Sequence, residues 1–398
     1  MNIVFLISHN SMYGANQSLL CMIDGLKKYD IKPYVISPSE GPITEMSEQK
    51  GIPYRVLPFK RWMSRNRWKS PARLMANLMV LPILIKQIKD WQIDLVYTND
   101  SEIPAGAFAA KLLALPHVWH IREFGYLDFG LSYDWGKPFF EKWIQRADVI
   151  IAVSEAVRHE VLANAANPVC VIYDPVMGAQ ALKRLQNINR SPDKNKPNVA
   201  LTFAIVGRVQ PPKGQEQAIR ALHKVRLDGY NVRLLVAGEG ENQFMNFLHE
   251  LCESLGVRDA VSFLGHVAKP FEVYQSADVI LMCSPHEAFG RVTVEAMAAA
   301  RPVIGYAAGG TPELIKDDYN GLLYDGSVDD LSDSMKKLLN NPEKIVSMGL
   351  KGQDMVKSFT NENHAAEIYK IVQKVMRETG NKKDKQQKYV KSGITSFH

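Results

Sequence analysis

Short apolar runs alternate with helix-length amphipathic stretches from one end of this chain to the other. The apolar runs cover residues 3–8, 33–37, 95–98, 117–120, 149–153, 169–172, 200–206, 232–237, 261–264, 279–283 and 302–306. Runs of this length are typical of strands buried on both faces, and strands that alternate with helices predict βαβ units. The pattern therefore predicts an α/β protein with parallel sheets and right-handed crossovers.

One polar stretch, residues 178–198, interrupts this alternation. A chain of 398 residues is too long for one ordinary core, so we place a domain boundary in the polar stretch. The predicted parts are a first domain (1–174), a linker (175–198), a second domain (199–361), a helix at about 362–380 that could cross back to the first domain, and a polar basic tail (381–398). Doubly wound domains bind ligands at the carboxyl ends of their strands, so we expect both to face a central cleft.

The composition, with 46% hydrophobic and 23% charged residues, is that of a soluble globular enzyme. The four cysteines form no C-x-x-C pair, which favours reduced thiols and a cytoplasmic location. The first residues lack the basic region and cleavage site of a signal peptide. The net charge is +6, and its clusters at 183–196 and 382–391 do not interleave with aromatic residues. We therefore expect no nucleic-acid partner.

A basic and aromatic segment at 60–69 precedes an amphipathic run at 74–88. Such a face could rest on an anionic membrane, on its inner side, and reach a lipid-linked glycan. The other interpretation is a mobile surface loop before a core helix. The longest apolar stretch, 74–85, contains Asn77 and Pro82 and is too short to span a bilayer. We therefore expect at most peripheral membrane association.

Two carboxylates stand on either side of a Phe-Gly turn in the second half of the chain. Glu287 follows the apolar run at 279–282, and Glu295 is expected about two turns into the next helix, on the face that looks back at the loop. A helix N-terminus binds anions, so a phosphate flanked by carboxylates that seek hydroxyl groups indicates a nucleotide sugar. The alternative is a helix-capping acid and an exposed glutamate. The apolar flank at 292–300 disfavours a freely solvated Glu295.

Two cations lie in the loop that follows the strand predicted at 200–206. Arg208 and Lys213 are spaced to converge on a phosphate, and the loop lacks the G-x-x-x-x-G-K-[ST] order of a P-loop. Two solvated loop cations are the alternative. Gly14, after the first strand, would let backbone approach a ligand at a helix start, although a plain turn explains it equally well. The first strand is not followed by G-x-G-x-x-G, which disfavours a dinucleotide-binding dehydrogenase.

With these residues in place, the segment 207–324 resembles the nucleotide-sugar-binding domain of glycosyltransferase family 4, a retaining group with the GT-B fold. The elements that carry the resemblance are the E-x7-E pair of Glu287 and Glu295, the basic pair of Arg208 and Lys213, and the segments 307–315, 320–323 and 147–155. The likeness covers essentially the whole chain and is diffuse before His120. Tyr173-Asp174-Pro175 stands where the family more often has an Asn-Gly turn, and Arg291 replaces a commoner apolar residue.

The resemblance implies a role for each site residue. Arg208 and Lys213 would bind the donor diphosphate, Glu295 the ribose, and Glu287 the donor sugar near the reacting centre, where His120 would be the active-site histidine. The remaining donor-binding residues would be Gly14, His266, Val267, Phe289, Gly290, Arg291 and Val292. A satisfied strand-end histidine is the alternative for His120.

The resemblance also implies the reaction class. We expect retaining transfer of a sugar from a UDP- or GDP-sugar to a glycan or lipid-linked glycan, in surface polysaccharide synthesis. No Asp-x-Asp-like cluster follows a strand, so we expect neither a metal nor a cofactor. The alternatives are another GT-B enzyme, such as a sugar-nucleotide epimerase or a phosphorylase, and a non-catalytic module that binds a nucleotide or a glycan.

Overall fold

The computed structural model describes residues 1–187 and 200–391. It divides into two compact units, one of Met1–Pro175 with the C-terminal segment from Asn361, and one of Val176–Thr360. Part of the predicted linker is helical and belongs to the second unit, since α8 spans Ala179–Gln186. The rest of that prediction, from residue 188 onward, lies outside the described residues.

The first unit is built on a parallel sheet of order β3-β2-β1-β5-β6-β8-β9. Its strands are β1 (Asn2–Leu6), β2 (Lys32–Ser37), β3 (Tyr54–Val56), β5 (Leu95–Thr98), β6 (His117–Ile121), β8 (Val149–Ala152) and β9 (Val169–Val171). Its helices up to residue 175 are α1 (Gly14–Leu26), α2 (Pro42–Gln49), α3 (Ser70–Asp90), α4 (Ala105–Leu113), α5 (Tyr126–Phe129), α6 (Lys137–Ile144) and α7 (Glu155–Val161), with short 3-10 turns at Lys27–Tyr29 and Arg67–Lys69. Strand order reverses between β1 and β5, the point where such sheets bind ligands. A small antiparallel pair, β4 (Met63–Ser64) and β7 (Ser132–Tyr133), lies apart from this sheet.

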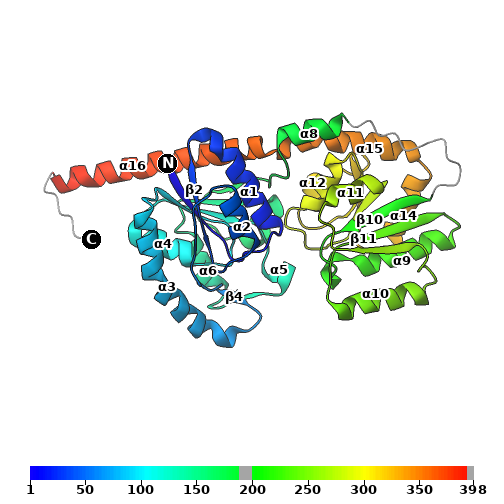
Figure 1. The fold of residues 1–398 in the computed structure, drawn as a ribbon, viewed down its shortest axis with the longest axis horizontal. Helices are drawn as coiled ribbons and strands as arrows, with labels where there is room; N and C mark the ends of the chain where they lie inside the picture. The colour runs from blue at the N-terminus through cyan, green and yellow to red at the C-terminus, as the bar shows by residue number, and fades with distance from the viewer. Residues whose placement is uncertain (188–199, 392–398) are drawn as a thin grey trace. The chain divides into compact units, whose positions relative to one another are not determined.

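The last helix, α16 (Asn361–Lys391), belongs to the first unit. It packs against α1 and the 3-10 turn that follows α1: a Cβ placed on Gly25 would lie 2.5 Å from the Asn361 carbonyl oxygen, and the rings of Tyr29 and Tyr369 stack at 4.1 Å. Figure 1 shows α16 running past α1 along this unit. The helix extends to Lys391, so it includes part of the stretch predicted as a polar tail from 381.

The second unit contains a parallel sheet of order β12-β11-β10-β13-β14-β15. Its strands are β10 (Leu201–Val206), β11 (Val232–Ala237), β12 (Val261–Gly265), β13 (Val279–Met282), β14 (Val303–Tyr306) and β15 (Gly321–Tyr324). Its helices after α8 are α9 (Gln215–Leu227), α10 (Asn242–Ser254), α11 (Pro270–Ser276), α12 (Arg291–Ala298), α13 (Thr311–Leu314), α14 (Val328–Leu339) and α15 (Pro342–Met355), with 3-10 turns η3 (Pro211–Lys213) and η4 (Val356–Phe359). Two doubly wound parallel sheets confirm the predicted fold class.

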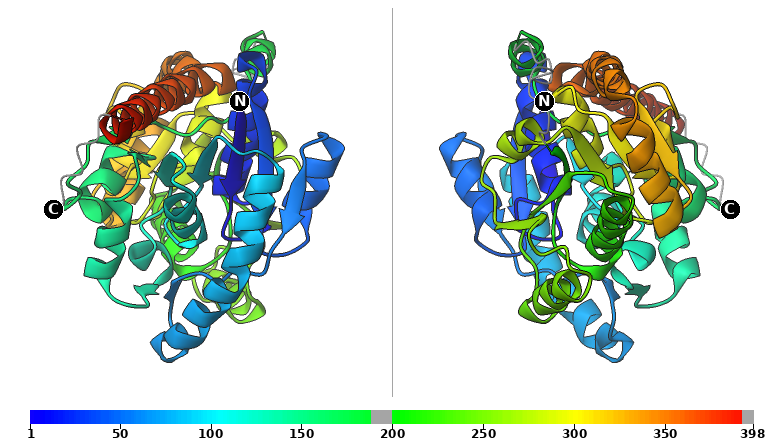
Figure 2. Two further views of the ribbon diagram at one scale, coloured as in Figure 1. Left: turned by 90° about the vertical axis from the view of Figure 1, so that its left-hand side faces the viewer. Right: turned by 90° about the vertical axis from the view of Figure 1, so that its right-hand side faces the viewer.

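Helix α3 is longer than its apolar sequence run indicated. The helical segment Arg67–Asp90 is long and apolar enough to cross a membrane by length and composition alone, and the apolar stretch 74–85 covers only part of it. Pro82 and Asn77 both lie within the helix. Figures 1 and 2 show α3 at the outer edge of the first unit.

Candidate functional site

The E-x7-E pair spans the loop between β13 and α12. Glu287 lies in that loop, and Glu295 is the fifth residue of α12, just over one turn from its start and not two as predicted. Gly290 opens the helix with a φ of 98°, a conformation that favours glycine. The Phe-Gly turn thus follows from the backbone that the helix start requires.

Lys213 and Glu287 form an ion pair between two neighbouring strand ends. Lys213 ends η3, which follows β10, and its Nζ lies 2.7 Å from Glu287 Oε2. The two side chains are 32% and 18% exposed, so a ligand could reach both. The basic loop and the carboxylate loop, predicted separately, therefore meet at one place.

The loop that carries Arg208 and Lys213 is held in place by contacts with Gln215 and with the end of β13. Gln215, which is 1% exposed, donates to the Arg208 carbonyl oxygen at 3.1 Å. Gly214 has a φ of 76°, and a Cβ there would lie 2.5 Å from Cys283 Cβ at the end of β13. The Arg208 side chain itself is exposed. Only glycine at 214 lets the loop lie against the next strand.

Glu295 is oriented by a buried tyrosine. The Tyr274 hydroxyl in α11 donates to Glu295 Oε2 at 2.8 Å, and an Arg291 Nη2 lies 3.3 Å from Oε1. Burial, together with the Glu295 carboxylate, raises the pKa of Tyr274 well above its usual 10. The hydroxyl therefore remains a donor, and it holds the carboxylate in one position.

Two glycines hold the carboxylate loop from the side of β14. The Gly310 N–H donates to the Glu287 carbonyl oxygen at 2.7 Å. A Cβ on Gly309 would lie 2.6 Å from that same oxygen, and one on Gly310 would lie 2.6 Å from the Ala288 oxygen. Phe289, 4% exposed, packs its ring against Phe359 at 5.8 Å. The segment 307–315, first noted for its resemblance, thus supports Glu287 directly.

The other predicted donor residues of the second unit are less closely gathered. His266, which is exposed, and Val267 follow β12, two strands from β10 in the sheet order. Val292 lies in the first turn of α12 beside Arg291. Contacts therefore join Lys213 to Glu287 and Arg291 to Glu295. His266 belongs to neither pair.

In the first unit, Gly14 is the first residue of α1, after β1. His120 lies within β6 and is fully buried. Its Nδ1 is 2.7 Å from the Tyr97 hydroxyl, and its ring stacks at 6.3 Å on that of His364. Within the described residues, its Nε2 has no hydrogen-bond partner. Burial, then the nearby Arg122 charge, lowers the pKa of His120 well below 6.5, so the imidazole is neutral.

Sequence reasoning missed three carboxylate side chains that lie near the strand-order reversal of the first sheet. Asp100 and Glu102 follow β5, and Glu123 follows β6. Glu123 Oε1 accepts from the Ser101 N–H and hydroxyl, both at 2.6 Å, while Glu102 pairs with Arg61 at 2.9 Å. Burial and the Glu102 charge raise the pKa of Asp100 to about 7. The strand-end rule that found Glu287 would have found Asp100 and Glu102.

Sequence reasoning also missed Tyr274 and Gln215, which are polar residues on otherwise unremarkable helices.

Among the described residues, no group of three or more His, Cys, Asp or Glu side chains could hold a metal ion.

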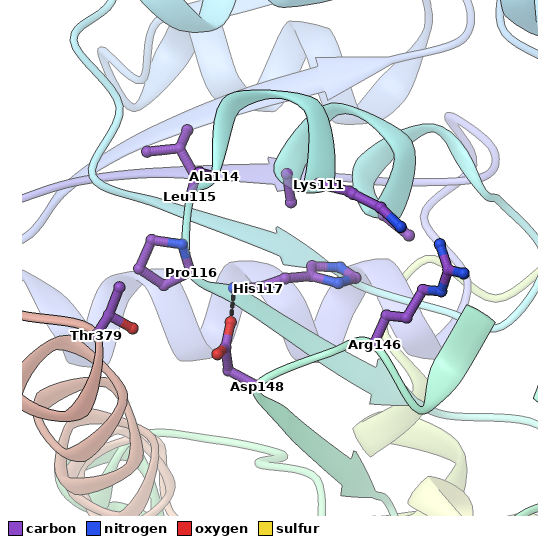
Figure 3. A pocket seen from close by; sticks show the side chains of 10 residues that line it. Lys111, Ala114, Leu115, Pro116, His117, Arg146, Asp148 and Thr379 are labelled. Carbon is purple, nitrogen blue, oxygen red and sulfur yellow. Dashed lines mark hydrogen bonds between the residues drawn. The ribbon is translucent and has the colours of Figure 1, made fainter. Parts of the chain in front are cut away.

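A hollow of about 370 Å³ lies at the opposite, amino edge of the first sheet (Figure 3). It is bordered by Lys111, His117, Arg146, Asp148 and Thr379, and the His117 N–H donates to Asp148 at 3.0 Å. No predicted site residue lines it.

Two family models match the chain. One described as Glycosyltransferase Family 4 matches residues 12–176, and one described as Glycosyl transferases group 1 matches residues 186–355.

Similar proteins and structures agree with these matches. An uncharacterised glycosyltransferase of Methanocaldococcus jannaschii is 37% identical over 43% of this chain and 45% of that protein. The D-inositol 3-phosphate glycosyltransferase of Corynebacterium aurimucosum is 34% identical over 42% of each. The chain therefore aligns with less than half the length of these two relatives.

Two solved structures match almost the whole chain. Anabaena HepE in complex with UDP has a TM-score of 0.76 at 21% identity, over 94% of this chain and 100% of that one. A glycosyltransferase of Rickettsia africae has a TM-score of 0.77 at 19% identity, over 94% and 98%. At such identities the likeness shows the fold alone, which is the two-domain GT-B fold.

Proposed function

The chain belongs to the group 1 glycosyltransferases of family 4, and on that premise we propose that it transfers a sugar from a nucleotide-sugar donor to an acceptor hydroxyl. The observation that supports the proposal is the Lys213–Glu287 ion pair, because it brings the cation proposed to bind phosphate next to the carboxylate proposed to bind the sugar. Glu295, oriented by Tyr274, lies on the helix that follows the same loop.

The donor diphosphate is the ligand proposed for the basic loop. Lys213 acts as a point charge and Arg208 as a fork for two oxygens, and together they neutralise the departing nucleoside diphosphate. Backbone N–H groups from Phe289 to Val292 and the glycine at 14 are proposed to assist. These side chains supply the charge that a divalent ion would otherwise supply, so the proposal includes no metal and no cofactor.

The carboxylates are proposed to bind hydroxyl groups. Glu295 accepts hydrogen bonds from the ribose hydroxyl groups. The bond from the Tyr274 hydroxyl to Oε2 holds the carboxylate in position for this role. Glu287 binds the donor sugar next to the reacting bond, and His266 with Val267 lies beside the base. In the free protein Lys213 satisfies Glu287, which keeps both charges paired until a donor arrives.

His120 is proposed as the active-site histidine. Burial raises the pKa of Tyr97, so its hydroxyl stays protonated and can donate to His120 Nδ1. That tautomer leaves Nε2–H without an acceptor, and because His120 is fully buried, the proposal requires that ligand binding uncover this atom. A neutral imidazole suits this role, because it adds no charge to the site.

The finer features of the reaction are part of the same proposal. The transfer retains the anomeric configuration, and the acceptor is a glycan or a lipid-linked glycan of surface polysaccharide synthesis. The donor is a UDP- or GDP-sugar, and one HepE structure was solved with UDP-glucose, which makes this donor the first to test. A cytoplasmic location is part of the same proposal, since the four cysteines of the sequence form no C-x-x-C pair.

The proposal is tested by incubating the protein with UDP- and GDP-sugars and a glycan or lipid-linked acceptor, and measuring free nucleotide and product. Release of UDP or GDP with a glycoside of unchanged anomeric configuration supports it. An isomerised nucleotide sugar without release would indicate an epimerase, and a phosphate-dependent sugar phosphate a phosphorylase. If the protein binds a donor but neither releases the nucleotide nor transfers the sugar to any acceptor, it would be a non-catalytic binding module.

A further inference from the structure

One side of helix α3 faces the first unit and is held there by polar contacts and buried apolar side chains. The Arg73 guanidinium pairs with Asp134, whose side chain is 1% exposed, and its Nε donates to Asp134 Oδ2 at 2.7 Å. The Asn77 amide bonds the Lys60 backbone in both directions, accepting its N–H at 2.7 Å and donating to its carbonyl oxygen at 3.0 Å. Leu84 and Ile88 are buried in the core. The helix is therefore fixed in place and cannot leave the unit without breaking these contacts.

The opposite side of α3 is apolar and uncovered. Every exposed residue between 71 and 83 is apolar, namely Pro71, Ala72, Met75, Leu78, Met79, Pro82 and Ile83. Met79 is 73% exposed, Met75 57% and Ile83 52%, and the preceding Trp68 is 94% exposed. Spacings of three and four residues place them on one stripe. We call these eight residues the α3 face.

The surroundings of the α3 face are mostly cationic, and the one exposed carboxylate of the helix, Asp90 at its end, pairs with Lys86 at 3.1 Å. Residues 60–89 contain eight Lys or Arg residues and no Asp or Glu. Lys60, Arg67 and Lys69 are exposed before the helix, and Lys86 and Lys89 are exposed in its last turns. Cations at both ends of an apolar stripe, with a tryptophan beside it, are the features that place a helix in an anionic membrane interface.

We propose that the α3 face docks this protein on the surface of an anionic lipid bilayer, with α3 lying in the interface and not crossing it. Arg73 and Asn77, tied to the protein on the inner side, exclude a spanning position. The cationic rim disfavours a second copy of this chain as the occupant, since two such rims would repel each other. The inference goes beyond sugar transfer, and it would bring the site to a lipid-linked acceptor.

Co-flotation of the full chain with vesicles tests the proposal. We expect binding to phosphatidylcholine vesicles that contain phosphatidylglycerol, weaker binding to phosphatidylcholine alone, and loss of binding as salt rises. The double variant Met79→Asp/Ile83→Asp should bind the anionic vesicles at least tenfold more weakly. Its matched control is Leu227→Asp/Leu350→Asp, which charges two residues of the second unit that are 71% and 57% exposed. The control should bind as the unmodified chain does.

Thermal unfolding and size-exclusion chromatography accompany the flotation. Both double variants should unfold as the unmodified chain does, since all four side chains are exposed. No flotation with anionic vesicles, or equal loss in the two double variants, would overturn the proposal. So would a dimer of the unmodified chain that Met79→Asp/Ile83→Asp converts to a monomer, because the α3 face would then bind a second copy. Nucleotide release from a soluble donor does not depend on this face, so the two proposals fail separately.

Discussion

Lys213 Nζ lies 2.7 Å from Glu287 Oε2, at the carboxyl ends of the neighbouring strands β10 and β13. The two side chains are 74 residues apart in sequence and come from the loops that flank the strand-order reversal of the second sheet. This contact joins the cation and the carboxylate on which the proposed donor site depends.

Replacing Glu287 with Gln should separate binding from turnover. The amide keeps the shape of the side chain but loses the charge that is proposed to bind the sugar near the reacting bond. We expect nucleotide release to fall about 100-fold or more while the affinity for UDP or GDP alone stays within a few-fold. The control is Glu216→Gln on α9, an exposed partner of Arg220. Equal release by Glu287→Gln and the control would remove Glu287 from the reaction.

Tyr274→Phe removes the hydrogen bond that orients Glu295. One such bond to a charged group contributes about 1.5 to 3 kcal/mol, so we expect KM for the donor to rise about tenfold or more with a smaller change in kcat. Tyr230→Phe is the control, since its hydroxyl bonds Asn340 at 3.0 Å on an exposed surface. Steady-state kinetics with varied donor checks this. An unchanged KM would show that Glu295 does not need Tyr274.

Gly309→Ala should lower the free energy of unfolding by more than the cost of placing alanine at a positive φ, because the new side chain would also displace the carboxylate loop. Gly309 and Gly256 both have positive φ, 59° and 64°, but only a Cβ at 309 meets another atom, the Glu287 oxygen at 2.6 Å. Gly256→Ala should therefore cost about 1 kcal/mol in the free energy of unfolding, and Gly309→Ala more, with weaker donor binding. Denaturant unfolding and calorimetry measure both. Equal behaviour of the two variants would contradict the packing account.

The buried His117 should make the stability of the protein depend on pH. Burial lowers the pKa of His117 to about 3, so the unfolded chain binds a proton below pH 6.5 that the folded chain does not. Folding stability from this group is therefore lost as pH falls from about 6.5 toward 3. His117→Gln lacks this contribution, so the unmodified chain should lose up to about 2 kcal/mol more than the variant between pH 7 and 5.

Urea unfolding at both pH values measures this difference. His159→Gln, at a side chain that is 74% exposed, is the control and should show the same pH dependence as the unmodified chain. A His117→Gln variant that behaves like the control would show that His117 is not neutral in the folded protein.

The sequence predicted the fold because parallel strands are buried on both faces and read as continuous apolar runs. It predicted Glu287 and Glu295 because each stands close to a strand end or helix start whose pattern is clear. Tyr274 and Gln215 could not be predicted, because their roles depend on which helices and loops become neighbours. Asp100 could have been found from its place after a strand.

Helix α3 shows a different limit of periodicity. Its inner side contains Leu84 and Ile88 and its outer side contains Met75 and Met79, so both sides are apolar and the pattern does not distinguish them. Only the packed unit reveals which side is uncovered. The short strand β3 (Tyr54–Val56) at the sheet edge also escaped prediction, because three residues make too weak a pattern.

The affinity of Lys213→Ala for a nucleoside diphosphate, measured by calorimetry with UDP and GDP, tests whether the loop after β10 binds the donor. The control is Lys224→Ala, which removes an exposed cation of α9 paired with Asp329. We expect whichever nucleotide binds the unmodified protein to bind Lys213→Ala at least tenfold more weakly, and to bind the control with unchanged affinity. Equal affinity of the unmodified protein and Lys213→Ala would contradict the assignment of a donor site to this loop.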